Sequence, residues 1–181
     1  MTWVDRRLQS WRIAQARPFI KPGARVLDLG SADGALFQQL VGISSESLGI
    51  DPTLKTNVRV QGVLLVSGKF PNDMPDVEPF DVITMLAVLE HFPDDAYAGL
   101  SENCAKFLKP NGRVVITVPS AVVDHILAVL KFFRLIDGMS IEEHHGYDTK
   151  RTETIFYPRF KFVRHHRFQL GLNNLFVFEK V

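Results

Sequence analysis

The sequence predicts an α/β protein with a doubly wound, mostly parallel sheet and helices on both faces. Between residues 25 and 119, short apolar runs rich in Val, Ile and Leu alternate with segments of helical spacing. This alternation is typical of parallel strands joined by crossover helices. Two strand-like runs follow each other in residues 159–181, and such a pair can add an antiparallel edge.

The composition is that of an ordinary globular domain. The chain has 181 residues, of which 46% are hydrophobic and 23% charged, and its net charge is +1. We therefore expect one domain over residues 1–181 and no general attraction to nucleic acid or anionic membranes. Cys104 is the single cysteine, so no disulfide can form within the chain. The N-terminus lacks the apolar core of a signal peptide, and a cytoplasmic location is expected.

Membrane spanning is not expected either. The most apolar stretch, residues 121–136, is interrupted by charged and polar side chains, Asp124, His125, Lys131 and Arg134. It is too short and too charged to cross a bilayer.

The first elements follow from apolar spacing and from helix-breaking residues. Tryptophan, leucine and isoleucine alternate with arginine and glutamine over residues 1–20, which predicts an amphipathic helix that ends near Pro18. A second helix is expected at residues 35–41, after a glycine-bearing turn. The buried strands of this half are predicted at residues 25–29, 47–50 and 62–66.

The second half continues the alternation. Prolines at positions 71, 75 and 79 predict a loop, and a helix is expected at residues 94–108 with Asp94 as its N-cap. A further helix is predicted at 122–135, followed by a histidine-bearing loop at 142–148. The strands of this half are predicted at residues 80–85, 113–118, 160–168 and 175–179.

The turn after the first strand carries the strongest functional signal. Gly30 and Gly34 allow a ligand to approach the backbone closely. A pyrophosphate would avoid the nearby carboxylates of Asp28 and Asp33, whereas a ligand with an ammonium or sulfonium would be attracted. The turn therefore predicts a nucleoside-type cofactor that carries a positive charge, rather than NAD or ATP.

Asp51 ends the next strand, about 20 residues past the first turn, and at this spacing an acid reaches ribose hydroxyls. One carboxylate can accept from both hydroxyls. The alternatives are that Asp51 is a turn residue before Pro52 and that the glycines form a plain tight turn. Ala32 replaces the close-approach glycine of a dinucleotide site, and no phosphate-binding Lys-Ser/Thr pair follows.

These segments resemble the motifs of the class I S-adenosylmethionine-dependent methyltransferases. The resemblance covers residues 25 to about 119 and implies a Rossmann-like, seven-strand-type fold with S-adenosylmethionine as cofactor. The four matching motifs, in chain order, are residues 26–34, 48–52, 80–91 and 108–119. The tail, residues 143–148 and 168–175, is similar to methyltransferases linked to bacterial cell-surface polysaccharide genes, which implies a sugar-containing acceptor.

The resemblance implies a role for each matching position. Gly30 and Ser31 would let the backbone meet the methionine part of the cofactor, and Asp28 would lie near its ammonium. Asp51 would accept from the ribose hydroxyls, and Leu86 would flank the methionine end. The full implied set is Asp28, Gly30, Ser31, Gly34, Asp51, Pro52, Gly68, Phe70 and Leu86.

Two departures from the family pattern affect this set. Ala32 stands where the family usually has its middle glycine. Lys69 stands where the family often has an acid that accepts from the adenine amino group, and a charged lysine cannot accept a hydrogen bond. Adenine would then be held by backbone groups near Gly68 and by the Phe70 ring.

Histidines are the candidate general bases for an oxygen acceptor. His91 follows the fourth strand of the motif set, while His144 and His145 lie in the predicted loop after the fifth. The alternatives are a helix-start or packing role for His91 and a solvated loop for the other two. Glu90 is expected either to orient His91 or bind the acceptor, or to be a solvated helix residue.

Other chemistries have little support in the sequence. Cys104 falls on the apolar face of a predicted helix, so core packing is expected. The adjacent pairs His144-His145 and His165-His166 lack helical i, i+4 spacing, and no metal site is predicted. The basic, aromatic run 159–168 alternates like a strand with one apolar and one wet face, which disfavours a nucleic-acid patch.

The sequence thus predicts a methyltransferase that acts on a small-molecule or sugar-containing acceptor, with its cofactor core at residues 25–119. The N-terminal helix (1–20) and the region 120–158 would shape the acceptor side, and residues 159–181 would close the sheet. The alternatives are an RNA or protein methyltransferase with the same core, a non-enzymatic protein of this fold, and a nicotinamide-dependent oxidoreductase.

Overall fold

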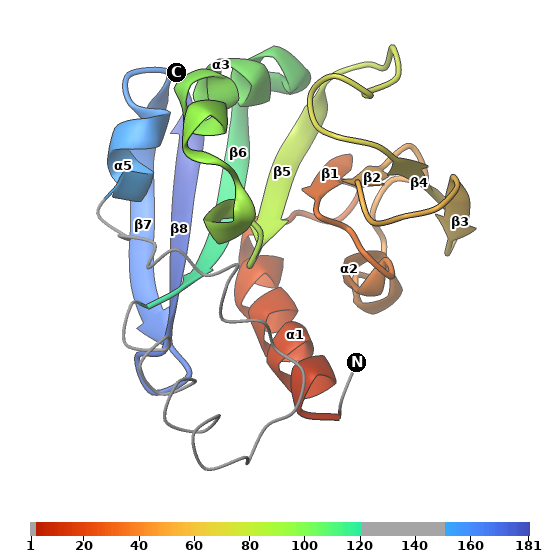
Figure 1. The fold of residues 1–181 in the computed structure, drawn as a ribbon, viewed down its shortest axis with the longest axis horizontal. Coiled ribbons are helices and arrows are strands. Elements are labelled where there is room, and N and C mark those ends of the chain that lie inside the picture. Colours follow the sequence, from red (N-terminus) through yellow and green to blue (C-terminus); the bar gives the residue numbers. More distant parts are fainter. Residues whose placement is uncertain (1–2, 121–150) are drawn as a thin grey trace.

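The structure is a computed structural model that describes residues 3–120 and 151–181. These residues build one sheet with helices on both of its faces (Figure 1). The strands are β1 (Val26–Leu29), β2 (Leu48–Asp51), β3 (Val58–Val60), β4 (Val63–Ser67), β5 (Phe80–Leu86), β6 (Leu108–Pro119), β7 (Phe160–Phe168) and β8 (Asn173–Lys180). The α-helices are α1 (Trp3–Ala16), α2 (Ala35–Gln39), α3 (Tyr97–Phe107) and α5 (Arg151–Phe156).

The sheet confirms the predicted doubly wound, mostly parallel topology. Its strand order is β3-β4-β2-β1-β5-β6-β8-β7. The five strands from β4 to β6 are parallel, while β8 runs antiparallel to β6 and β7 antiparallel to β8. The short strand β3, which pairs antiparallel with β4 at the edge, was not predicted. With three residues, two of them exposed, β3 leaves no apolar pattern in the sequence.

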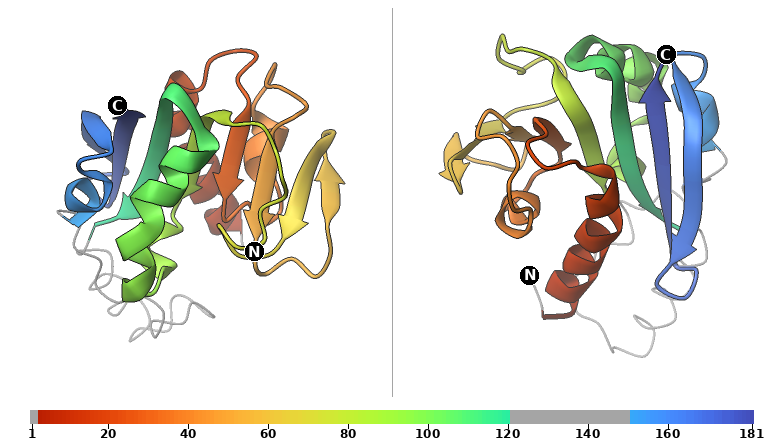
Figure 2. Two further views of the ribbon diagram at one scale, coloured as in Figure 1. Left: turned by 90° about the horizontal axis from the view of Figure 1, so that it is seen from above. Right: turned by 180° about the vertical axis from the view of Figure 1, so that it is seen from behind.

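Two apolar layers cover the two faces of the sheet. On one face, α1 and α2 pack through Ile13, Ala16 and Phe37 against the sheet residues Val26 and Val82. The opposite face is covered by α3 and α5, and the left view of Figure 2 shows α3 on the side away from α1 and α2. Successive strand residues point to opposite faces, so the buried central strands are apolar throughout.

The α3 side confirms one expectation and corrects another. Cys104 is fully buried in this layer, and burial raises the pKa of its thiol. Asp94 is not the N-cap of α3. It lies in the 3₁₀ turn Asp94–Ala96 that precedes the helix, and its carboxylate pairs with Arg151 at 3.1 Å. Because this turn already has helical geometry, α3 begins at Tyr97 without a side-chain cap.

The end of the chain forms the predicted strand pair, but β7 lacks the predicted alternation of burial. Only Phe160 and Phe168, its two end residues, are buried, because β7 is an edge strand. The predicted helix 122–135 and the loop 142–148, with His144 and His145, lie outside the described residues. Within residues 3–120 and 151–181, no helix has the length and apolar character needed to cross a bilayer.

Candidate functional site

The strand order brings the predicted site residues to the carboxyl ends of neighbouring central strands. Strand β1 lies between β2 and β5, and all three are parallel, so their carboxyl ends meet. Asp28 pairs in register with Gly49 on β2 and with Thr84 on β5. Asp28, Asp51 and Leu86 therefore lie at the same end of three adjacent strands.

Asp28 is a buried carboxyl group with a perturbed pKa. It is 5% exposed, and the Thr84 hydroxyl donates a 2.6 Å hydrogen bond to its Oδ1. Burial raises the pKa of Asp28 to about 7, although the bond from Thr84 opposes the rise, and the nearby charge of Asp51 adds to it. At neutral pH the carboxyl is thus partly protonated, and a cation placed beside it would favour the ionised form.

Asp51 fastens the turn after β1 to the end of β2. Its Oδ2 accepts from the backbone N–H of Ala32 at 2.8 Å. Its Oδ1 accepts from both the N–H and the hydroxyl of Thr53, at 2.7 and 2.5 Å. The turn role and the ligand role predicted for Asp51 are therefore compatible. Each carboxylate oxygen has two acceptor sites, so Oδ2 has one left for a ligand donor.

The turn itself contains strained backbone. Gly30 has φ +76°, and a Cβ placed there would overlap the Val88 side chain, so both the φ angle and Val88 require glycine. Ala32 has φ +42° and Ala87, just after β5, has φ +59°. The left-handed region is uncommon for alanine, and two such residues flank the same strand ends. The left-handed φ of Ala32 explains why the family pattern has glycine at this position, since glycine adopts this conformation without strain.

Ser31 and Gly49 form a contact that sequence reasoning did not single out. A Cβ on Gly49 would lie 2.6 Å from both Cβ and Oγ of Ser31, so only glycine at position 49 lets Ser31 lie against β2. Ser31 is 4% exposed, and its hydroxyl has no hydrogen-bond partner among the described residues. The turn therefore has an open polar group beside Asp51.

Helix α1 adds a charged side chain that the sequence did not identify as functional. Arg12 is half-buried, and this burial lowers the pKa of its guanidinium while the charges of Glu90 and Asp5 oppose that shift. Its Nε has no partner among the described residues. No motif marks Arg12, because its position beside Glu90 depends on how α1 docks on the sheet.

The turn after β5 carries Glu90 and His91, two neighbouring residues that were predicted to act near the acceptor, and they differ in burial. Glu90 is 5% exposed, so the solvated alternative for this residue is wrong. His91 ends the same 3₁₀ turn, Leu89–His91, and is exposed. Leu86 precedes the turn and is half-buried, and its predicted place beside the methionine end of the cofactor stays a prediction.

Asp33 joins the turn after β1 to the two helices beside it. Its Oδ1 accepts from the backbone N–H of Ala35 at 3.2 Å and from the side chain of Gln9 on α1, also at 3.2 Å. Gly34, with φ +72°, begins the helix in left-handed conformation. Asp33 thus links the turn to α1, while the buried Asp28 and Asp51 remain at the strand tips.

The loop after β4 brings an acid to the predicted adenine side. Asp73 folds back so that its Oδ2 accepts from the Lys69 N–H at 2.7 Å, and a Cβ on Gly68 would overlap it. The Phe70 ring packs on Phe107 of α3, with centroids 5.5 Å apart, and is half-buried. A carboxylate is thus present beside Gly68 and Lys69, four residues further along the chain than the position discussed from the sequence.

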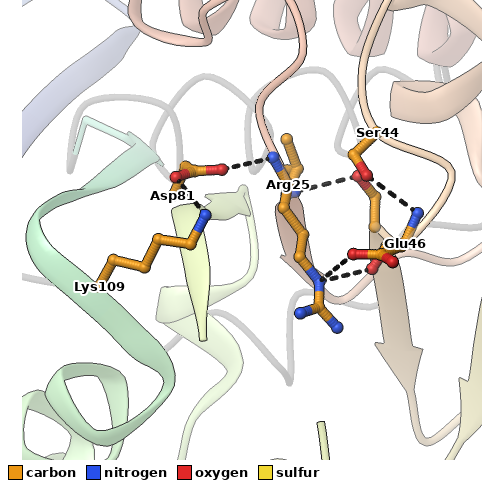
Figure 3. Close-up of polar contacts among 7 residues, drawn as sticks. Arg25, Ser44, Glu46, Asp81 and Lys109 are labelled. Carbon is orange, nitrogen blue, oxygen red and sulfur yellow. Dashed lines mark hydrogen bonds and ion pairs between the residues drawn. The ribbon is translucent and has the colours of Figure 1, made fainter. Parts of the chain in front are cut away.

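Polar contacts hold the amino ends of the strands together, at the end of the sheet opposite Asp28 and Asp51. There Asp81 accepts from the Arg25 backbone N–H and from Lys109, both at 2.8 Å, while the Arg25 side chain bonds the Glu46 carbonyl at 2.9 Å (Figure 3). Partial burial would raise the pKa of Asp81, but these bonds hold it below its ordinary value. A hollow of about 500 Å³ beside Asp81 and Lys109 lies at this amino edge, away from Asp28 and Asp51.

The family of the chain follows from comparison with known proteins. A family model described as a methyltransferase domain matches residues 2–169. The chain belongs to the class I S-adenosylmethionine-dependent methyltransferases. The predicted family, its cofactor and the fold class are thereby confirmed.

Curated relatives and solved structures agree with this family. Ubiquinone biosynthesis O-methyltransferases of Thiobacillus denitrificans and Xylella fastidiosa are 32% and 34% identical over 118 and 120 residues, in each case 60% of this chain. Those alignments cover 50% and 47% of the relatives, so the chain spans about half of their length.

A solved structure of the N-methyltransferase NodS from Bradyrhizobium japonicum, in complex with S-adenosylhomocysteine, superposes with TM-score 0.67 at 17% identity. It covers 96% of this chain and 86% of that chain. At this identity the likeness concerns the fold alone.

Proposed function

We propose that this methyltransferase transfers a methyl group from S-adenosylmethionine to a small-molecule acceptor at oxygen. The observation that carries the proposal is the pair of buried carboxyl groups, Asp28 and Asp51, at the tips of adjacent parallel strands beside a glycine turn. A cofactor that combines an ammonium, a sulfonium and a ribose diol matches this pair in charge and in hydrogen bonding.

The strand-tip residues fit such a cofactor. The open acceptor site on Asp51 Oδ2 suits a ribose hydroxyl, and the orphaned Ser31 hydroxyl suits a polar group of the methionine part. Asp28 would interact with the ammonium through water or backbone groups. The other residues proposed to line the cofactor are Gly30, Gly34, Pro52, Gly68, Phe70 and Leu86.

Two further side chains are proposed as cofactor contacts from their positions. Arg12 is a half-buried cation near Glu90, its Nε has no partner among the described residues, and it suits the methionine carboxylate. Asp73 is exposed, and its second oxygen, Oδ1, is available to accept from the adenine amino group while Oδ2 holds the Lys69 N–H. The Asp73 carboxylate would supply the hydrogen-bond acceptor for adenine that the charged Lys69 side chain cannot provide.

When bound, S-adenosylmethionine supplies a methyl group that its positive sulfur makes electrophilic, so the protein mainly positions the acceptor. We propose His91 as the general base that takes the proton from an acceptor hydroxyl. It is exposed at the carboxyl end of β5, where an incoming acceptor can reach it. His144 and His145 stay predictions for the same role.

The acceptor atom and class are supported by different observations. The curated relatives are named as O-methyltransferases of ubiquinone biosynthesis, which supports oxygen. The similarity of the tail to methyltransferases of polysaccharide genes supports a sugar-containing acceptor. Nitrogen is the alternative atom, since several structures of this fold are named as N-methyltransferases.

The test starts with cofactor binding. Titration calorimetry with S-adenosylhomocysteine should give saturable binding that Asp51→Ala weakens by ~1–3 kcal/mol, the range for charge-assisted hydrogen bonds. Thr53→Val is the matched control, because it removes one bond to Asp51 and leaves the carboxylate in place. Equal affinity of Asp51→Ala and the wild-type protein would make the ribose assignment wrong.

The acceptor is identified with a labelled methyl donor. The panel contains phenols, sugar-containing lipids, amines, RNA and protein. Transfer to a phenol or sugar hydroxyl supports the proposal, whereas transfer only to RNA or protein would assign the chain to that class. If neither S-adenosylmethionine nor its demethylated product binds, the protein is a non-enzymatic member of the fold.

A further inference from the structure

The outward side of α1 exposes two tryptophans in an arrangement that packing in the core does not explain. Trp3 is 69% exposed and Trp11 48% exposed. Arg7 lies between them at i, i+4 and i+8 spacing, and its guanidinium stacks on the Trp3 ring at 4.7 Å. We call Trp3, Arg7 and Trp11 the indole face. Tryptophan is enriched at protein interfaces and at the interface between a membrane and water, because one end of its side chain is apolar and the other polar.

Arginines predominate among the charges on the outward side of α1, although the exposed acid Asp33 lies next to Gln9 of this helix. Arg6, Arg7 and Arg17 are exposed, and none of them has an acidic partner among the described residues. Asp5, on the same helix, is half-buried and acts on Arg12 instead. The chain as a whole carries a net charge of only +1, so this positive charge is local to α1.

The β7–β8 hairpin extends the same end of the molecule. Gln169, at the hairpin, donates to the Leu8 carbonyl of α1 at 3.5 Å, and His166 bonds Gln15 at 2.8 Å. Leu170, at the hairpin tip, is fully exposed. Figure 1 and the right view of Figure 2 show the start of α1 and this hairpin projecting in one direction, beyond the carboxyl ends of β5 and β6.

We propose that the indole face docks α1 on an anionic lipid surface. Indole rings favour the boundary between headgroups and acyl chains, and arginines on the same helix attract anionic headgroups. Nucleic acid would be matched by the arginines but not by apolar Leu170 at the same end. A second copy of this chain would bring the unpaired arginines of two α1 helices together.

Docking of this kind would face the candidate site toward the membrane. Gln9 of α1 bonds Asp33 on the turn after β1 at 3.2 Å, so the helix that carries the indole face lies beside the strand tips, where an acceptor carried in the bilayer could reach the proposed cofactor. This consequence rests on the proposed function, whereas lipid binding itself does not.

Vesicle flotation tests the docking directly. The wild-type protein should float with vesicles of phosphatidylcholine mixed with phosphatidylglycerol, far less with phosphatidylcholine alone, and the binding should weaken with added salt. Tryptophan fluorescence should shift to the blue on binding. Trp3→Ser/Trp11→Ser should abolish flotation, and Arg6→Gln/Arg7→Gln should weaken it by roughly five-fold per cation removed.

The matched control is Val41→Ser/Tyr157→Ser, which removes two exposed apolar side chains from other parts of the surface. It should float like the wild-type protein. Circular dichroism checks that each variant is folded, and S-adenosylhomocysteine affinity should be equal in all of them. If that affinity is absent throughout but flotation remains, the proposed function fails and the docking stands.

Three results would overturn the docking proposal. The first is wild-type protein that stays with the aqueous fraction in the presence of anionic vesicles. The second is a tryptophan variant that floats like the control. The third is sedimentation showing that Trp3→Ser/Trp11→Ser converts a stable dimer into a monomer, which would make the face a contact between copies.

Discussion

The carboxyl group of Asp28 has two properties that ordinarily exclude each other: it is buried, and it lies near a second acid. Most buried acids have a cationic partner, because an isolated buried charge is costly. Here Thr84 donates one hydrogen bond, and the charge of Asp51 acts against ionisation. A raised pKa combined with a place at the strand ends is typical of a functional site.

The raised pKa has a consequence for stability. The pKa of Asp28 rises from 3.8 to about 7 on folding, so between these values the folded protein binds more protons than the unfolded chain. This contribution to stability is complete below pH 3.8 and is lost as the pH rises through about 7. Asp28→Asn should therefore raise the unfolding free energy at pH 8 by up to about 4 kcal/mol. The melting temperature at pH 8 should rise accordingly.

Thermal unfolding of wild-type and Asp28→Asn protein across pH 4 to 8 measures this difference. We expect the variant to gain stability relative to the wild-type protein as the pH rises. Asp33→Asn, at an exposed acid on the same turn, is the control. A constant difference between Asp28→Asn and wild-type protein over the whole range would contradict the assignment.

Gly30 provides a second prediction at the residue scale. Gly30→Ala adds a left-handed alanine and an overlap with Val88, whereas Gly62→Ala adds only the left-handed alanine, since nothing lies within 4 Å of its new Cβ. The conformational part costs about 1–2 kcal/mol in each. Chemical denaturation should show a larger loss for Gly30→Ala, and Val88→Ala in that background should recover the excess. Equal losses would mean that Val88 does not restrict position 30.

At the scale of elements, the short 3₁₀ turn after β5 decides which side chain meets solvent. Its geometry buries Glu90 and exposes His91, although the two are neighbours in the sequence. Helix α1 then docks beside this turn and brings Arg12 near Glu90. The same helix meets the β1 turn through Gln9 and Asp33. The strand tips are thus flanked by two elements that are far apart in the chain, α1 and the turn after β5.

The turn predicts how a base at His91 would behave. His91→Ala should lower kcat by about 10²–10⁴-fold, the usual contribution of general acid–base catalysis, with S-adenosylhomocysteine affinity unchanged. The limb of the pH–rate profile near the histidine pKa should disappear. His91→Gln separates hydrogen bonding from proton transfer. If His145→Ala causes the loss and His91→Ala does not, the base belongs to the predicted 142–148 loop.

At the scale of the whole molecule, the cofactor is expected to couple the two halves of the sheet. The proposed contacts come from β1, β2, the loop after β4 and the turn after β5, and only the folded chain brings them together. A ligand at 100 times its Kd should therefore stabilise the protein by about 2.7 kcal/mol. Thermal shift with S-adenosylhomocysteine measures this effect. Asp51→Ala should show a smaller shift at the same ligand concentration, and an identical shift would argue against the strand-tip site.

Much of the fold could be predicted because the relevant signals are local. Apolar runs and the turn residues between them located the central strands, and the motif around Asp28 with the spacing to Asp51 located the strand tips. The N-cap at Asp94 was predicted wrongly, because the 3₁₀ turn Asp94–Ala96 precedes α3 and the Asp94 carboxylate pairs with Arg151, which is distant in the chain.

The sequence by itself determined the order of the central strands and helices, the family, and the two acids at the tips of β1 and β2, because these depend on short-range spacing. Only the tertiary structure decided that Gly49 makes room for Ser31, that the Asp73 side chain accepts from the Lys69 N–H, and that Arg12 lies near Glu90. The tertiary structure also decided the pKa of Asp28, which depends on burial between two strands. Such contacts join residues that are distant in the chain, so no local pattern encodes them.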